Sequence, residues 1–180
     1  MNGAALGGLH CGVMGGRLVY INQALPTTSE CTDPTASYSG AIEAFQPDWI
    51  VWSVGANEIF DHAAGSQILR AGTDTFDFVL RRRLDELTRL AENANAKVAV
   101  MTPACIDKNA PKVQKPVAHL RQTLIAYARS RSRRVRLIDW YGELCAPGQD
   151  VAARWWTAGG LTEAGARHTW QWIERELVHN

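Results

Sequence analysis

The first residues in this sequence whose types and spacing could do chemistry are Gly55, Asn57 and Glu58. They follow an apolar segment, Asp48–Val54, that has the length and composition of a buried strand. In open α/β sheets the carboxyl ends of the strands form the edge where ligands bind. Because a side-chain amide at that edge can donate a hydrogen bond to an oxyanion, we expect Asn57 and Gly55 to form part of an oxyanion hole.

Further polar side chains follow within the same loop, and we place Glu58 and His62 in a candidate cleft. Glu58 and Asp61 make a pair of carboxylates, but no Asp-x-Asp or His-x-x-x-Asp spacing accompanies them. We therefore predict no metal ion and no other cofactor. For His10, His62 and His168, an exposed or packing position competes with a role in the site.

Apolar segments of strand length alternate with amphipathic segments of helix length. We expect strands at Arg17–Asn22, Asp48–Val54, Lys97–Thr102 and Val135–Asp139, and helices at Ser37–Phe45, Thr75–Asn93, Val113–Ser130 and Thr162–Val178. This alternation predicts a parallel sheet covered by helices on both faces. The fold class is therefore α/β, a flavodoxin-like three-layer α/β/α sandwich, and residues 1–180 are expected to form a single domain.

The start of the chain departs from this pattern. The glycine-rich segment Asn2–Gly16 precedes the first strand-like segment, Arg17–Asn22. A doubly wound sheet normally begins with a strand, so we expect the first strand of the sheet to be missing.

The seven tryptophans fall into two groups. Trp49 and Trp52 are expected to pack against opposite helix layers, and Ser53, in the same strand, to be buried. Trp155 and Trp156 precede the last helix, beside the expected cleft. For this second pair, stacking on a ligand and anchoring of the loop both stay open.

Two blocks of the sequence resemble those of the SGNH (GDSL-type) hydrolases. Pro47–Glu58 matches the third block of that family, Pro-Asp-x-Val-x-x-x-x-Gly-x-Asn-Asp. Thr157–Ala166 matches its final block, in which Asp-x-x-His is followed by Leu-Thr-x-x-Gly-Ala. The segment from Arg136 to Cys145 resembles the strand and loop before that block. The similarity covers roughly residues 17–178 and is closest to the SGNH domains attached to membrane acyltransferases.

The resemblance implies an ester hydrolase or O-acyltransferase ancestry, with acylated cell-envelope carbohydrate or another small ester as the substrate. It also implies a Ser–His–Asp triad. No Gly-Asp-Ser occurs in the chain, Thr157 and Gly160 stand where the family has aspartate and histidine, and Glu58 replaces the third-block aspartate. We therefore expect an impaired domain in which Gly55 and Asn57 are the remnant of an oxyanion hole and Thr157 and Gly160 belong to the candidate cleft.

Two other functions stay open. The nucleophile could lie upstream of Met1, which would make the chain a fragment of an active acetylesterase or O-acetyltransferase. The domain could instead be a non-catalytic module that binds carbohydrate or protein. The resemblance further implies association with a membrane acyltransferase.

Composition narrows the partners and the cellular location. The formal net charge of +1 provides no field for nucleic acid, so no nucleic-acid partner is expected. No apolar run reaches the roughly 18 residues of a membrane span, so we expect no direct insertion into a membrane. The first residues lack the basic segment of a signal peptide, which favours the cytoplasm as the chain is written. As part of an envelope acyltransferase it would be extracytoplasmic.

The four cysteines show no Cys-x-x-Cys spacing, which argues against zinc. Cys105 and Cys145 each follow an expected strand near the same sheet edge. A disulfide between them, which would suit an oxidising compartment, and four free thiols both stay open.

One basic cluster, Arg129–Arg134, closes an expected helix. Cations suit the negative end of the helix dipole, so a solvated helix end is the interpretation we favour. Contact with a polyanion or a partner is the alternative.

Overall fold

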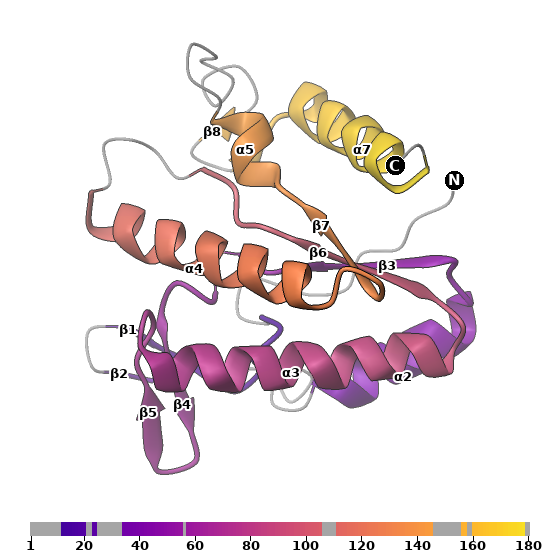
Figure 1. Cartoon of the computed structure of the whole chain (residues 1–180). Helices are drawn as coiled ribbons and strands as arrows, with labels where there is room; N and C mark the ends of the chain where they lie inside the picture. Colours follow the sequence, from indigo (N-terminus) through magenta and orange to yellow (C-terminus); the bar gives the residue numbers. More distant parts are fainter. Residues whose placement is uncertain are drawn as a thin grey trace.

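The structure, a computed structural model, describes residues 12–20, 23–24, 34–55, 57–105, 111–145, 156–157 and 160–178. Within these residues the strands form a three-stranded parallel sheet, a four-stranded antiparallel sheet and a two-stranded hairpin. Figure 1 shows helices above and below the parallel sheet.

The parallel sheet consists of β3 (Trp49–Ser53), β6 (Lys97–Met101) and β7 (Val135–Ile138), in the order β3-β6-β7. All three strands lie where the sequence predicts them. The α/β fold class with a parallel sheet between helices is therefore confirmed.

The helices lie on both faces of this sheet. The face shown below the sheet in Figure 1 carries α2 (Pro34–Phe45), α3 (Asp74–Asn93) and α4 (Pro111–Ser130), and the other carries α5 (Trp140–Leu144) and α7 (Glu163–Val178). The four helices predicted from the sequence are confirmed. Of the described helices, none combines the length and the apolar composition that crossing a bilayer requires.

The central strand β6 shows why the sheet is buried on both faces. Val98 and Val100 belong to a core with α3 and α4, whereas Ala99 and Met101 belong to a core with α7. Successive side chains of a strand point to opposite faces, so a continuous apolar run is the pattern of a strand covered on both sides.

The tryptophans of β3 follow the same rule. Trp52 packs into the core formed with α3 and α4. Its ring lies edge-on to that of Tyr38, with 5.1 Å between the ring centroids. Trp49 packs against the α7 core. The prediction that these two side chains face opposite layers is therefore confirmed.

The segment Arg17–Asn22 was expected in the parallel sheet, and this prediction is wrong. It forms β1 (Arg17–Tyr20), which pairs antiparallel with β2 (Gln23–Ala24) on one side and β4 (Asp61–Ala64) on the other. Thus β1 leaves no gap for a missing strand beside it. The expectation of a missing first strand rested on this placement of Arg17–Asn22, and it is corrected with it.

The antiparallel sheet depends on a tight hairpin that the sequence analysis did not identify. β4 pairs with β5 (Gln67–Leu69), and Ala64 lies opposite Gln67 across the two-residue loop Gly65-Ser66. Gly65 has a φ of +62°, a conformation that favours glycine at the first position of such a loop. His62 therefore lies on a strand and not in the loop where it was predicted.

Candidate functional site

The candidate site begins at the carboxyl end of β3. The N–H of Val54 still donates to the carbonyl of Met101 at 3.1 Å, and the chain then leaves the sheet at Gly55. A turn follows that is closed by the N–H of Glu58 on the carbonyl of Gly55, also at 3.1 Å. Gly55 and Asn57 therefore lie at the edge where open α/β sheets bind ligands.

Gly55 and Asn57 leave room for a ligand. No described atom lies within 4 Å of the position that a Cβ on Gly55 would take, and the φ of this residue is not positive. Neither packing nor backbone conformation therefore explains the glycine. Asn57 is half-buried, and its side-chain amide has no hydrogen-bond partner among the described residues. An unengaged amide beside open space can donate to an oxyanion.

Ser53 also differs from its prediction, because it is exposed and not buried. Trp49 and Val51, the preceding residues on the same face of β3, pack against the α7 core. Ser53 is the next residue on that face and lies beyond the part of the strand that these contacts cover.

Glu58 is buried, with 3% of its surface exposed. Its carboxylate accepts hydrogen bonds from the N–H groups of Gly55 at 3.1 Å and Met14 at 3.4 Å. Burial raises the pKa of Glu58, and the nearby His62 partly offsets that rise. The expectation that Glu58 lines an open cleft is corrected: the carboxylate lies beneath the turn and stabilises it.

His62 is buried to the same extent as Glu58. Its Nδ1 lies 3.0 Å from the carbonyl oxygen of Gly15, and its Nε2 lies 3.1 Å from that of Asn57. A carbonyl oxygen only accepts, so both contacts are hydrogen bonds when both ring nitrogens carry protons. With both nitrogens engaged, His62 has no position from which to take a proton from a hydroxyl, and its expected place in the cleft is corrected.

The segment Gly12–Gly16 packs against this turn. Arg83 Nε donates to the carbonyl of Val13 at 3.0 Å, which fixes the segment to α3. A Cβ on Gly12 would lie 2.9 Å from that of Asn57 and would overlap the Glu58 carboxylate. Glycine is therefore required at this position by the close approach of the buried acid.

Thr157 and Gly160 lie in a hairpin formed by β8 (Trp156–Thr157) and β9 (Gly160–Leu161). The two residues are direct partners in the antiparallel register. Trp155 and the side chains of Trp156 and Thr157 lie outside the described residues, so their predicted place in the cleft stays a prediction.

The other described histidines each face an acid on a neighbouring helix. His119 Nε2 lies 3.0 Å from an oxygen of Asp77, which is buried and also accepts from the hydroxyl of Thr123 at 2.8 Å. His168 Nε2 lies 3.2 Å from Glu143. Neither histidine is at the position that the resemblance assigns to the catalytic one, and His10 lies outside the described residues.

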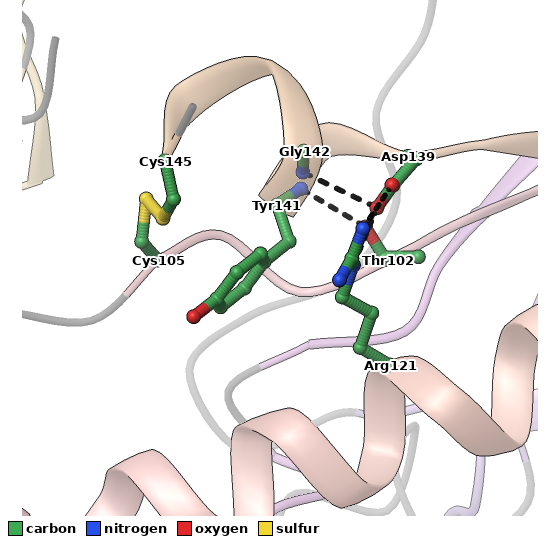
Figure 2. Close-up of a disulfide and its surroundings, with 7 residues drawn as sticks. All are labelled: Thr102, Cys105, Arg121, Asp139, Tyr141, Gly142 and Cys145. Atoms are coloured by element: carbon green, nitrogen blue, oxygen red, sulfur yellow. Dashed lines mark hydrogen bonds and ion pairs between the residues drawn. A yellow bond between two sulfur atoms is a disulfide. The ribbon is translucent and has the colours of Figure 1, made fainter. Parts of the chain in front are cut away.

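Sequence reasoning missed a polar network at the ends of β6 and β7 (Figure 2). The Asp139 carboxylate accepts two hydrogen bonds from Arg121, at 2.9 and 2.6 Å, and one from the hydroxyl of Thr102 at 3.1 Å. It also accepts from the N–H of Gly142 at 3.2 Å and so caps α5. The Arg121 guanidinium holds the pKa of Asp139 below its usual value.

Cys105 and Cys145 form a disulfide beside this network, with their Cα atoms 6.1 Å apart (Figure 2). The bridge joins the segment after β6 to the end of α5. Of the two alternatives left open by the sequence, the structure has the bridge.

A group of three or more histidine, cysteine, aspartate or glutamate side chains that could hold a metal ion is not found among the described residues. The described residues at this edge offer hydrogen-bond donation from Asn57 to an anionic or carbonyl oxygen.

Comparison with known proteins bears on the fold. The structure is similar to the crystal structure of a lipase/acylhydrolase from Enterococcus faecalis, with a TM-score of 0.53 and 19% sequence identity over 81% of this chain and 70% of that one. The chain shares the α/β fold of a lipase/acylhydrolase. No family model matches the sequence. No curated protein matches it either. At this identity the likeness supports the fold alone, and the activity is a separate question.

Proposed function

We propose that this chain is an SGNH-type hydrolase domain in which acyl transfer is impaired and ester binding is retained. The observation that carries the proposal is the β8–β9 hairpin, where Thr157 and Gly160 are direct partners at the positions of the family's aspartate and histidine. A glycine cannot take a proton from a serine, and a threonine cannot orient a base as a carboxylate does.

The described histidines are already in contact with other groups of the fold. Both ring nitrogens of His62 face carbonyl oxygens, His119 faces Asp77, and His168 faces Glu143. Without an adjacent base a serine hydroxyl is a weak nucleophile.

What the proposed domain keeps is the means to bind an ester. The amide of Asn57, which has no hydrogen-bond partner among the described residues, can donate to the carbonyl oxygen of an acyl group, and no described atom occupies the Cβ position of Gly55 beside it. The ligand class that we propose is an acylated carbohydrate of the cell envelope or another small ester.

The disulfide supports a location outside the cytoplasm. Disulfides persist in oxidising compartments and are rare in the cytosol. Together with the resemblance, the Cys105–Cys145 bridge leads us to place the domain on the outer side of a membrane acyltransferase. Mass spectrometry after alkylation of the protein in its native cells tests this placement: an unalkylated, bridged pair supports it, and two alkylated thiols contradict it.

Hydrolysis of p-nitrophenyl acetate tests the loss of catalysis. We expect no turnover above buffer from the purified chain. The proposal fails if turnover is well above buffer and is abolished by either Asn57→Ala or His119→Gln. His119 is chosen because it is the described histidine whose ring contacts a buried acid, Asp77.

Binding is tested separately by NMR titration with an O-acetylated disaccharide. We expect the side-chain amide signals of Asn57 to shift and Asn57→Ala to weaken binding about tenfold. The matched control is Asn93→Ala, which removes an exposed amide at the end of α3. Equal weakening by both variants, or no shift in the wild-type protein, would contradict ester binding at this edge.

A further inference from the structure

A hollow lies at the amino ends of the parallel strands, opposite the candidate site. It has a volume of about 600 Å³ and is lined by the first residues of β3, β6 and β7 together with the carboxyl ends of α3 and α4. Pockets that bind small molecules span about 300–1,000 Å³, so this hollow is large enough for one. Because it lies at the amino ends of the strands, it is separate from the candidate site at their carboxyl ends.

The lining of this hollow is strongly basic. It contains one carboxylate, Glu92, and five cationic side chains: Lys97, Arg129, Arg133, Arg134 and Arg136. Five positive charges against one negative charge leave an excess of four. The whole chain carries a formal net charge of only +1, so the positive charge is concentrated at this end of the molecule.

Two of the five cations already form an ion pair or hydrogen bonds. Arg134 pairs with Glu92. Arg136 Nη1 donates to the carbonyls of Glu176 at 2.6 Å and Leu177 at 3.0 Å, near the carboxyl end of α7. A cation there stabilises the helix end, as expected from the helix dipole.

The other three cations, Lys97, Arg129 and Arg133, have no carboxylate partner among the described residues. Arg129 lies in the last turn of α4, where the helix dipole accounts for one charge. Lys97 begins a strand and Arg133 lies in a turn, so helix capping does not account for them. Their convergence with Arg129 on one hollow is the pattern of an anion site.

The hollow also has an aromatic wall. Trp49 lines it, with Lys97 Nζ 5.4 Å and Arg136 Cζ 5.2 Å from the centroid of the indole ring. These cation–π contacts hold the two cations beside an apolar surface. The wall offers a contact for an organic group that carries the anion.

We propose that this basic hollow binds the phosphate group of an organic phosphate. Guanidinium groups match phosphate oxygens with two parallel hydrogen bonds, and the hollow offers two such groups without carboxylate partners, on Arg129 and Arg133, together with the Lys97 ammonium. The phosphate can belong to a soluble compound or to a lipid headgroup. The proposal is independent of ester binding and of catalysis at the other edge.

The test compares two double variants that remove the same charge. Arg129→Gln/Arg133→Gln removes two cations of the hollow that have no carboxylate partner among the described residues. Arg17→Gln/Arg82→Gln is the control, because these exposed side chains lie on β1 and α3, outside the hollow. The thermal midpoints of all proteins are measured first to show that they fold.

Soluble phosphate is tested by calorimetric titration with glycerol 3-phosphate and with pyrophosphate at about 0.15 M salt, where the Debye length is about 8 Å. Lipid phosphate is tested by co-sedimentation with vesicles of phosphatidylcholine, with and without phosphatidylglycerol. We expect the wild-type protein to bind in at least one of these assays, the hollow variant to bind at least about tenfold more weakly, and the control to stay within about twofold of the wild type.

Binding in calorimetry supports a soluble ligand, and binding only to vesicles that contain phosphatidylglycerol supports a lipid headgroup. The proposal is overturned if the wild-type protein binds in neither assay. It is also overturned if both double variants weaken binding equally, since that result would show an effect of overall charge alone.

Discussion

The Cys105–Cys145 disulfide is a constraint at the candidate site whose contribution can be calculated. It joins the segment after β6 to the end of α5, and the two cysteines are separated by 40 residues in the sequence (Figure 2). The perturbation that isolates it is the double substitution Cys105→Ser/Cys145→Ser. This change removes the cross-link and leaves the Asp139 network beside it in place.

The expected magnitude follows from loop closure in the unfolded chain. For a separation of 40 residues, the entropy that the cross-link removes is about 2.1 + 1.5R ln 40, or about 13 cal/mol/K. At 25 °C this amounts to about 4 kcal/mol of stability. For a chain of this size each kcal/mol shifts Tm by about 2–4 °C, so we expect the double variant to melt about 8–16 °C lower.

Calorimetry measures the change in Tm, and urea denaturation independently measures the change in the free energy of unfolding. Cys105→Ala/Cys145→Ala is the control for packing, because both cysteines are half-buried; it should match the serine variant if the cross-link and not the thiol side chains accounts for the loss. A double variant that melts within about 2 °C of the wild type would refute the reasoning, since it would place the loss below about 1 kcal/mol.

Three further predictions concern buried or crowded groups of the site. Arg121 lowers the pKa of Asp139, so ionised Asp139 stabilises the fold above its ordinary pKa of 3.8, and this stabilisation is lost as pH falls through the lowered pKa. Asp139→Asn should therefore lower the free energy of unfolding in urea by about 1–3 kcal/mol at pH 7 and by less under acid conditions. Since burial raises the pKa of Glu58, the contribution of Glu58 to stability should be most favourable below its ordinary pKa of 4.5 and should be lost as pH rises through the raised value. Glu58→Gln should remove this part of the pH dependence in unfolding curves recorded across pH. Gly12→Ala should destabilise the protein by about 1–3 kcal/mol because its Cβ meets Glu58, whereas Gly55→Ala, whose Cβ meets no described atom, should leave Tm within about 2 °C and weaken ester binding alone.

The elements that could be predicted from the sequence are those with a long periodic pattern. The helix α3 places Leu80, Leu84 and Leu87 on one face at intervals of three and four residues, and all three are fully buried. The central strand β6 is apolar at successive positions because helices cover both of its faces. In both elements the apolar positions in the sequence are the positions that are buried, so the pattern along the sequence indicates the element.

The antiparallel sheet could not be predicted in the same way. Its strands are two to four residues long, too short for a reliable alternation, and β1 pairs with β4 more than 40 residues away. The local signal that was present, the two-residue Gly65-Ser66 loop, was not used. This omission misplaced His62, and with it the expectation of an accessible histidine beside Asn57.

The Asp139 network shows a different limit. Arg121 and Asp139 are 18 residues apart on different elements, and nothing in either residue's neighbours indicates the pairing. The capping of α5 by Asp139 was accessible from the Asp-x-x-Gly spacing, because a carboxylate at that position accepts from a helical N–H. The arginine that lowers its pKa follows only from the packing of α4 against the sheet.

The residues at which we propose that catalysis was lost and the residues that hold Asn57 in place lie on different elements. A domain can therefore lose catalysis and still fold. Asn57 is held in place by the buried Glu58 and His62, which bind the main chain of Met14, Gly15 and the turn itself. Thr157 and Gly160, the proposed triad positions, lie instead in the β8–β9 hairpin, and none of the hydrogen bonds that Glu58 and His62 form among the described residues involves that hairpin. Replacing the aspartate and histidine there therefore leaves the support of Asn57 intact. Because a buried acid left without its hydrogen-bond donors is costly, the turn is the part of such a site that we expect to persist if catalysis is lost.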